Sequence, residues 1–168
     1  MNSDSVSQHR NEAANAISVA VITVSDTRTM ETDRGGQTIL DLLEGTEHRV
    51  VSRVIVRDEP AEIVKAVEDS LTVAGAILIT GGTGISNRDQ TYETITGLLN
   101  KPIPGYGELF RMLSYEEIGA ASMLSRATGG IRGNTVILTM PGSTAAVKLA
   151  MEKLIIPELA HLVHEASK

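Results

Sequence analysis

The sequence has 168 residues and contains no cysteine and no tryptophan, with only one phenylalanine and three tyrosines. The absence of cysteine excludes disulfide bonds, thiolate metal sites and a cysteine nucleophile. The shortage of aromatic side chains argues against the stacking platforms with which proteins bind single-stranded nucleic acid. It also predicts a core of aliphatic side chains and methionine, which favours a layered α/β protein.

Long hydrophobic runs are also missing, because no apolar stretch approaches the roughly 18 residues that a membrane-spanning helix needs. The polar N-terminus lacks the apolar segment of a secretory signal. A net charge of −6 and a pI near 5.2 disfavour a general partner such as nucleic acid or an anionic membrane. We therefore expect a cytoplasmic protein that binds neither, although a local basic pocket for a phosphorylated small molecule stays possible.

The chain length favours one compact domain, which buries roughly 70% of its unfolded surface. Residues 1–16 are polar and are predicted to form a flexible N-terminal tail, with ordering at a subunit contact as the alternative. Residues 17–168 show no linker or internal repeat. The sequence thus predicts a tail followed by a single domain.

Apolar runs and amphipathic segments alternate along this domain. Strands are predicted at 17–24, 49–56, 76–80 and 135–140, and a hairpin strand within 125–131. Helices are predicted at 36–43, 60–73, 92–99, 107–113, 115–124, 145–153 and 158–166, with Ser114 and Glu117 as a capping box for the fifth of them. The alternation indicates an α/β class with a mainly parallel central sheet and right-handed crossovers.

The most informative stretch is the strand at 76–80 and the glycine-rich turn that follows it, Gly81-Gly-Thr-Gly84. Such a turn lets backbone N–H groups converge on an anion, and the next helix adds the positive end of its dipole. Arg88, Asp89 and Thr91 follow immediately. Because open α/β sheets bind ligands beyond the carboxyl ends of their strands, we place the active site here.

Three aspartates follow the ends of predicted parallel strands: Asp26, Asp58 and Asp89. Parallel topology would bring their loops to one edge of the sheet, where carboxylates beside a phosphate cradle suit Mg²⁺. An aspartate before a helix is more often a simple N-cap. For Asp58 both interpretations stay open, whereas the position of Asp89 inside the glycine-rich motif favours a functional role.

Other motifs are incomplete. Asn87 stands where a dinucleotide-binding GxGxxG motif needs its third glycine, and no Lys-Ser or Lys-Thr pair follows the turn as in a P-loop. Ser143 lacks the GxSxG context of a hydrolase nucleophile. His161 and His164 lie one helical turn apart without a third metal ligand, so we interpret them as surface residues.

Two motifs taken together resemble a known family. Thr80-Gly-Gly-Thr-Gly-Ile-Ser-Asn-Arg-Asp-Gln-Thr91 and Met140-Pro-Gly-Ser-Thr144 are similar to the two molybdopterin-binding signatures of the MoaB/MogA family, which includes the G domain of gephyrin. The stretch at 104–119 and Ser125-Arg-Ala resemble the MoaB branch. The resemblance spans residues 17–162, nearly the whole chain.

The resemblance implies a single three-layer α/β domain with a small β-hairpin. It also implies MgATP-dependent adenylylation of molybdopterin, which yields adenylyl-molybdopterin and pyrophosphate before metal insertion. ATP and molybdopterin would then be the substrates, and Mg²⁺ the metal. Relatives assemble as trimers, or as hexamers in the MoaB branch, so we expect a homo-oligomer. We also expect a separate metal-insertion protein, because this chain ends after its final helix.

Carried over residue by residue, the resemblance makes Asp58 and Asp89 the catalytic carboxylates and the Mg²⁺ ligands. The positions that it implies for substrate binding are Thr80, Gly81, Gly82, Thr83, Gly84, Ser86, Arg88, Thr91, Glu108, Ser125, Pro141, Gly142 and Ser143. One departure from adenylating relatives is the pair Gln90 and Tyr92, where those proteins commonly have valine and proline.

Three functional hypotheses follow. The first is a molybdopterin adenylyltransferase, the second a carrier that binds molybdopterin without turnover, and the third a nucleotide-binding scaffold with no preference for a pterin. The intact Asp58 and Asp89 favour the enzyme, because a carrier has no need of Mg²⁺ ligands. The sequence does not distinguish a molybdenum pathway from a tungsten pathway.

Overall fold

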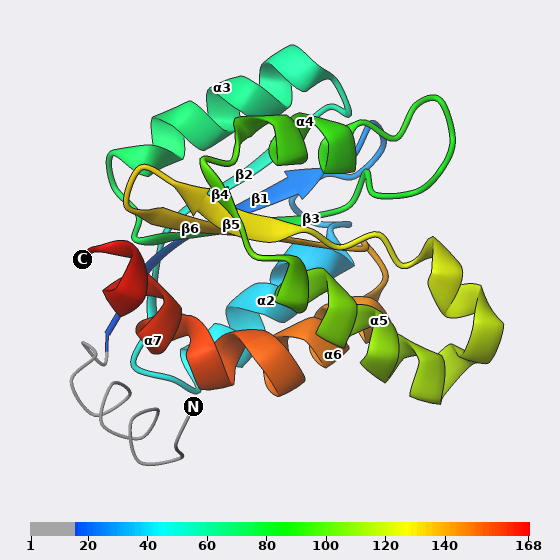
Figure 1. The fold of residues 1–168 in the computed structure, drawn as a ribbon. Coiled ribbons are helices and arrows are strands. Elements are labelled where there is room, and N and C mark those ends of the chain that lie inside the picture. Colours follow the sequence, from blue (N-terminus) through cyan, green and yellow to red (C-terminus); the bar gives the residue numbers. More distant parts are fainter. Residues whose placement is uncertain (1–15) are drawn as a thin grey trace.

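Six strands form one sheet through the middle of the part of the chain that the computed structural model describes, residues 16–168 (Figure 1). They are β1 (Ser18–Val24), β2 (Arg49–Val56), β3 (Ala76–Thr80), β4 (Lys101–Pro102), β5 (Gly129–Arg132) and β6 (Thr135–Met140). The sheet order is β2-β1-β3-β6-β5-β4. The first four strands in this order are parallel, and β5 and β4 join by antiparallel pairing. This confirms the predicted mainly parallel sheet. The predicted tail over 1–16 lies, except for Ala16, outside the described residues.

Helices cover both faces of the sheet, which gives three layers. They are α2 (Arg34–Glu44), α3 (Pro60–Leu71), α4 (Thr91–Leu98), α5 (Pro104–Ile118), α6 (Thr144–Ala150) and α7 (Ile156–Ala166). Figure 1 shows α3 and α4 on one face and the other four helices on the opposite face. None of these helices is long and apolar enough to cross a membrane.

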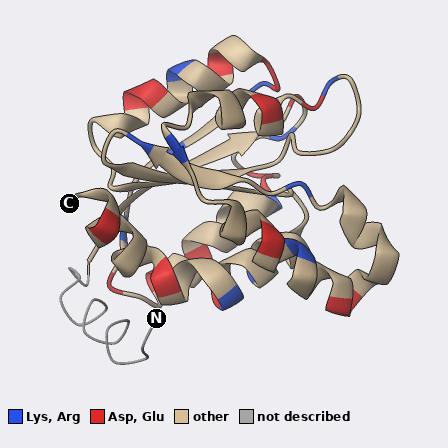
Figure 2. Ribbon diagram, in the orientation of Figure 1, with Lys and Arg blue, Asp and Glu red and all other residues tan. Residues whose placement is uncertain are grey.

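The core is divided by the sheet into two hydrophobic clusters. In β1, Val19 and Val21 pack into the cluster beneath α2 and α5, whereas Ala20 and Ile22 pack into the cluster beneath α3 and α4. This alternation follows from the two-residue period of a strand. β3 and β6 are also buried along their whole length, as parallel strands covered by helices are. The strands at the centre of the sheet accordingly carry no charged residue (Figure 2).

The predicted helix boundary at Ser114 is wrong. Residues 104–118 form one helix, and Ser114 is buried within it. Its hydroxyl donates a hydrogen bond to the carbonyl oxygen of Phe110, one turn back (2.8 Å), instead of capping a new helix. The helix ends at Gly119, whose φ is +59°, and a 3₁₀ segment, η1 (Gly119–Leu124), follows.

Two further boundaries differ from the prediction. The hairpin strand is shorter than expected, because only residues 129–131 of the predicted 125–131 pair with the sheet, and β5 continues one residue further to Arg132. The last two helices are joined through a wide π turn, η2 (Met151–Ile155), rather than by a break. The extra width of such a turn accommodates Pro157, which has no backbone N–H to donate to the preceding turn.

The parallel strands all end at the same edge of the sheet. The loops at 25–33, 57–59, 81–90 and 141–143 follow β1, β2, β3 and β6 there, and we call this the carboxyl edge. The two predicted signature motifs lie side by side at this edge, because β3 and β6 are neighbours in the sheet.

Candidate active site

The loop at 81–90, called the glycine-rich loop below, packs tightly against the groups around it. Gly81 and Gly82 have φ values of +93° and +63°, which L side chains rarely adopt. A Cβ atom on Gly81 would lie 2.3 Å from the carbonyl oxygen of Val24. On Gly82 it would lie 2.2 Å from Thr91 Oγ1 and 2.5 Å from Asp58 Oδ2. Only glycine fits at these two positions, and the backbone can therefore approach the buried carboxylate.

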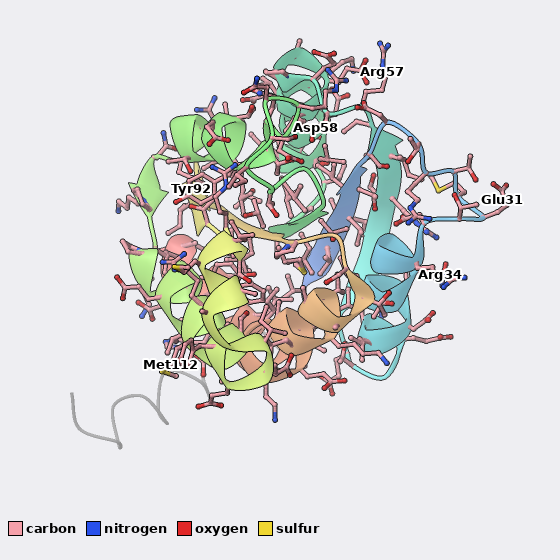
Figure 3. The ribbon with its side chains drawn as sticks, turned by 90° about the vertical axis from the view of Figure 1, so that its right-hand side faces the viewer. Glu31, Arg34, Arg57, Asp58, Tyr92 and Met112 are labelled. Carbon is pink, nitrogen blue, oxygen red and sulfur yellow. The ribbon has the colours of Figure 1, made fainter. Side chains whose placement is uncertain are left out.

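Asp58 is a buried carboxylate at the carboxyl edge, with 5% of its surface exposed. Its backbone N–H donates to Asp26 Oδ1 (3.1 Å), and its Oδ1 accepts from the N–H of Gln90 (3.0 Å). Burial raises the pKa of Asp58 above its ordinary value; the hydrogen bond from Gln90 opposes the shift, and the negative charges of Asp89 and Asp26 add to it. Figure 3 shows Asp58 pointing into the molecule while the neighbouring Arg57 points outward.

The simple capping role considered for Asp58 does not hold for the helix that follows it. The N-cap of α3 is Glu59, and no side chain there accepts a capping hydrogen bond. The Asp58 side chain instead receives a backbone N–H from the glycine-rich loop. Its position thus serves the loop rather than the start of α3.

Asp89 folds back beneath the same loop. Its Oδ2 accepts hydrogen bonds from the backbone N–H (3.0 Å) and the hydroxyl (2.6 Å) of Ser86. A Cβ atom on Gly84 would lie 2.6 Å from this oxygen, so the carboxylate lies directly against the loop backbone. The structure therefore brings Asp58 and Asp89 to the same loop, close enough for their charges to interact.

Arg88 links the glycine-rich loop to the loops after β1 and β2. Its guanidinium donates to both carboxylate oxygens of Asp26 (2.6 and 2.8 Å) and to Glu59 (2.6 Å). Hydrogen bonds from Arg88, and then from the backbone N–H of Asp58, lower the pKa of Asp26 to about 2. Arg88, predicted to bind substrate, is thus held by two acidic side chains of the protein.

The oxygen atoms near Gly82 have the character of a cation site. Thr91 Oγ1 is buried and has no hydrogen-bond partner among the described residues. It lies with Asp58 Oδ2 around the point where a Cβ atom of Gly82 would be. Hydroxyl and carboxylate oxygens suit Mg²⁺, which is commonly held by one or two carboxylates and completed by substrate phosphates and water. Within residues 16–168 no three His, Asp or Glu side chains form a complete protein-only metal site.

Arg126 is the residue that the sequence reasoning missed. It follows η1 and donates from Nε to the carbonyl oxygen of Thr83 (3.0 Å) and from Nη2 to that of Gly84. Glu93 in α4 forms an ion pair with Arg126, and the ring of Tyr92 lies 4.8 Å from its guanidinium carbon. The unusual Tyr92 therefore has a structural reason. The only sequence signal for Arg126 was its place in the Ser125-Arg-Ala motif, and the sequence alone assigns it no role.

The second signature motif contacts the first directly. Thr80 Oγ1 donates to the carbonyl oxygen of Pro141 (3.2 Å), and a Cβ atom on Gly142 would lie 3.3 Å from the Cα of Gly81. Ser143 caps α6 by accepting from the N–H of Ala146 (3.2 Å). The hydroxyl of Ser143 is therefore engaged in a local hydrogen bond, one of the two roles that a serine here could have.

A polar cavity of about 420 Å³ opens between the two motifs and the loop after β1. Its lining includes Gly81 and Ser143 together with two arginines that received no role from the sequence, Arg28 and Arg34. Figure 3 shows Arg34 at the start of α2, away from Asp58 and Tyr92. The carboxyl edge thus has an acidic side around Asp58, and around this cavity a mixed side where Arg28 and Arg34 lie with the buried Asp33.

Three of the predicted residues lie around a third region. Ser125, Pro141 and Ser143 line a smaller cavity of about 210 Å³ below the end of α5. Glu108 is exposed on α5 and lines neither cavity. The structure therefore brings Ser125 to the second motif and leaves Glu108 outside this group.

Comparison with known proteins identifies the family of this chain. A family model described as a probable molybdopterin binding domain matches residues 20–161. Molybdenum cofactor biosynthesis protein B of Bacillus subtilis is 50% identical over 169 residues, which cover 98% of each chain. The corresponding protein of Halalkalibacterium halodurans is 48% identical over 167 residues and likewise covers 98% of each chain.

Solved structures show the same fold. A crystal structure of molybdenum cofactor biosynthesis protein B has a TM-score of 0.89 and 47% identity, and covers 92% of this chain and 98% of that chain. The tungsten cofactor synthesizing protein MoaB from Pyrococcus furiosus has a TM-score of 0.83 and 38% identity, and covers 93% and 100%.

Proposed function

The chain belongs to the molybdopterin-binding domain family of molybdenum cofactor biosynthesis proteins, and from that premise we propose that it adenylylates molybdopterin with MgATP. A phosphate oxygen of molybdopterin would attack the α-phosphorus of ATP, and pyrophosphate would leave. The P–O bond to the new adenylyl group forms as the bond to pyrophosphate breaks. No covalent intermediate on the protein is needed.

The observation that carries this proposal is the group of oxygen atoms around Gly82. Asp58 Oδ2 and Thr91 Oγ1, which has no hydrogen-bond partner among the described residues, both lie beside Gly82, and Asp89 lies against the loop at Gly84. These side chains would hold Mg²⁺, which would offset the negative charge on the reacting phosphates. Burial, and then the nearby negative charges of Asp89 and Asp26, raise the pKa of Asp58, and this is the kind of crowded acidic site that a Mg²⁺ ion would neutralise.

The chain's own residues supply position and charge rather than a nucleophile. The N–H groups of Gly82, Thr83 and Gly84 form no hydrogen bond with another described residue, and in this proposal they would donate to phosphate oxygens. Transfer between phosphates depends mainly on such positioning and on electrostatic stabilisation of the transition state. The polar cavity beside Gly81 offers space for the non-reacting part of a substrate.

A carrier that binds molybdopterin without turnover is the second candidate. The observation that favours it is Arg88, whose guanidinium is already bonded to Asp26 and Glu59 and offers less to a phosphate. Both candidates keep the expected homo-oligomer, either a trimer or a hexamer, and a separate metal-insertion protein as part of the proposal. Light scattering on the purified chain tests the oligomer.

Pyrophosphate release from molybdopterin, ATP and Mg²⁺ separates the two candidates. We expect release that depends on molybdopterin, and in Asp89→Asn a loss of at least about tenfold, which corresponds to roughly 1.4 kcal/mol of transition-state stabilisation. Asp69→Asn is the matched control, because Asp69 pairs only with Lys65 on the exposed face of α3. Tight binding of molybdopterin without any release would identify a carrier, and equal rates in the two variants would contradict the role of Asp89.

A further inference from the structure

Arg126 contacts the backbone of the glycine-rich loop from a distant part of the chain. Its side chain is 24% exposed, and it reaches the loop from a position 42 residues further along the chain. One guanidinium donates to two successive carbonyl oxygens, those of Thr83 and Gly84. A planar, rigid fork of donors can hold two neighbouring acceptors at once, which a lysine ammonium does not do in a fixed geometry.

Fixing these two carbonyl groups also fixes two N–H groups. In a trans peptide the C=O and N–H bonds point in opposite directions, and the described chain contains no cis peptide. The carbonyl of Thr83 shares its peptide plane with the N–H of Gly84, and the carbonyl of Gly84 shares its plane with that of Ile85. Both N–H groups therefore point away from Arg126, and neither has a partner among the described residues.

The charge of Arg126 is already balanced within the protein. Glu93 in the first turn of α4 forms an ion pair with it, and the Arg126 guanidinium lowers the pKa of Glu93. The ring of Tyr92 lies against the guanidinium and restricts its orientation. Because its charge is paired and its donors face carbonyl oxygens, Arg126 acts on the loop by geometry rather than by attracting an anion.

We propose that Arg126 is a positioning residue, which holds the N–H groups of Gly84 and Ile85 in the direction needed to bind the phosphate groups of the substrates. This inference rests on the proposed function for the identity of the substrate. The geometry of the loop itself does not depend on that identity. Tyr92 and Glu93 support the same role, because they fix the guanidinium from α4.

Arg132 provides a matched control on the same protein. It also donates to a backbone carbonyl, that of Leu98 (3.2 Å), and to a glutamate, Glu68 (2.7 Å). Its side chain is 33% exposed, similar to that of Arg126, but it makes neither of these bonds with the glycine-rich loop. Arg132→Gln therefore removes a comparable set of contacts without touching the loop.

The first measurement is hydrogen exchange in the protein without substrates. The N–H groups of Gln90 and Thr91 are bonded to Asp58 and to the carbonyl of Gly82, so they report whether the loop stays in place. We expect exchange of these amides to be at least about tenfold faster in Arg126→Gln and unchanged in Arg132→Gln. Equal exchange in the two variants would overturn the inference, whatever the protein catalyses.

The second measurement is functional and uses Arg126→Lys, which keeps the charge. We expect kcat for pyrophosphate release to fall at least about tenfold in both Arg126→Gln and Arg126→Lys, because lysine does not reproduce the two-carbonyl contact. Rescue by lysine would overturn the inference in favour of a charge effect.

If the wild-type protein shows no turnover, the proposed function fails, and calorimetry with Mg²⁺ and inorganic pyrophosphate takes its place. Affinity reduced at least about tenfold in both variants then supports the inference, and unchanged affinity overturns it.

Discussion

The two halves of the glycine-rich loop are held in place by different forces. Residues 81–84 lie close to buried groups, with Thr83 only 4% exposed and two glycines in the left-handed region. Residues 85–89 are largely exposed, including Ile85 at 70%, and depend on the polar contacts of Ser86, Arg88 and Asp89. Close packing around Gly81 and Gly82, together with the hydrogen bonds from Arg126 to Thr83 and Gly84, thus fixes the inner half. The outer half depends on exposed contacts with which water competes. Changes to the inner half should lower the free energy of unfolding, whereas changes to the outer half should mainly alter the charge of the loop.

The largest effect is expected from Gly82→Ala. Alanine would need an unfavourable φ, and its Cβ would overlap Thr91 Oγ1 and Asp58 Oδ2. Backbone strain of about 1–3 kcal/mol and overpacking of about 1–3 kcal/mol together predict a loss of about 2–6 kcal/mol in the free energy of unfolding. Urea denaturation measures this loss.

Gly97→Ala is the control for that experiment. Gly97 lies within α4, and a Cβ atom there would meet no atom within 4 Å. Alanine favours a helix interior over glycine, so we expect stability to increase by about 0.5–1 kcal/mol. If both variants matched the wild-type stability, the inner half of the loop would not be fixed by steric exclusion.

A smaller effect is expected from Asp58→Asn, which should raise stability and lower activity. The raised pKa of Asp58 means that the folded state binds its proton more tightly than the unfolded state. Ionised Asp58 therefore lowers stability above that pKa and has no such effect below the ordinary pKa of an aspartate. We expect the variant to be more stable than the wild type at pH 7, with the difference disappearing as the pH falls below about 4. Activity should fall at least about tenfold.

Denaturation at several pH values tests this prediction directly. A variant that is less stable than the wild type at pH 7 would show that the ionised carboxylate stabilises the loop more than its burial costs. Asp69→Asn again serves as the control, because that side chain is exposed and its removal leaves the carboxyl edge unchanged.

These contrasts also explain what the sequence could predict. β1, β3 and β6 are runs of buried aliphatic residues, so the local pattern alone identifies them. Parallel topology then places Asp26, Asp58 and the glycine-rich loop at one edge. Each of these predictions depends on residues near one another in the sequence or on a general rule of sheet topology.

The features that the sequence did not predict depend on contacts between distant segments or on a choice between competing local hydrogen bonds. Arg126 meets Gly84 across 42 residues, and nothing in the local pattern of either residue indicates that contact. The continuity of α5 depends on Ser114 bonding back to Phe110, a choice between two local hydrogen bonds that the sequence leaves open. The unpartnered hydroxyl of Thr91 becomes visible only when the loop is folded over it.

The smallest effect on stability is expected from Arg88→Gln in the outer half of the loop. Exposed ion pairs contribute little to stability, so we expect almost no change in the midpoint of denaturation at neutral pH. The pKa of Asp26, about 2 with Arg88 present, should return toward the ordinary value. Any stabilisation by the pair is present above about pH 4 and is lost as the pH falls toward 2.

Carboxyl titration by nuclear magnetic resonance measures the pKa of Asp26. High salt should raise it toward the ordinary value in the wild type, because an exposed pair is screened. Lys65→Gln removes a different exposed ion pair, and we expect it to leave Asp26 unchanged. An Asp26 pKa near 2 in Arg88→Gln would show that the outer half is held by something other than this pair.

The pairing of β3 with β6 has a consequence for how the protein folds. Thr80 and Pro141 are 61 residues apart in the sequence, yet their hydrogen bond joins the two signature motifs. Contacts at such separation depend on closure of a long loop, so the two motifs meet only where β3 and β6 are paired. A ligand that bridges them binds only to chains in which this pairing has formed. At a hundred times its dissociation constant it would therefore add about 2.7 kcal/mol to the stability of the whole domain, not of the loops alone.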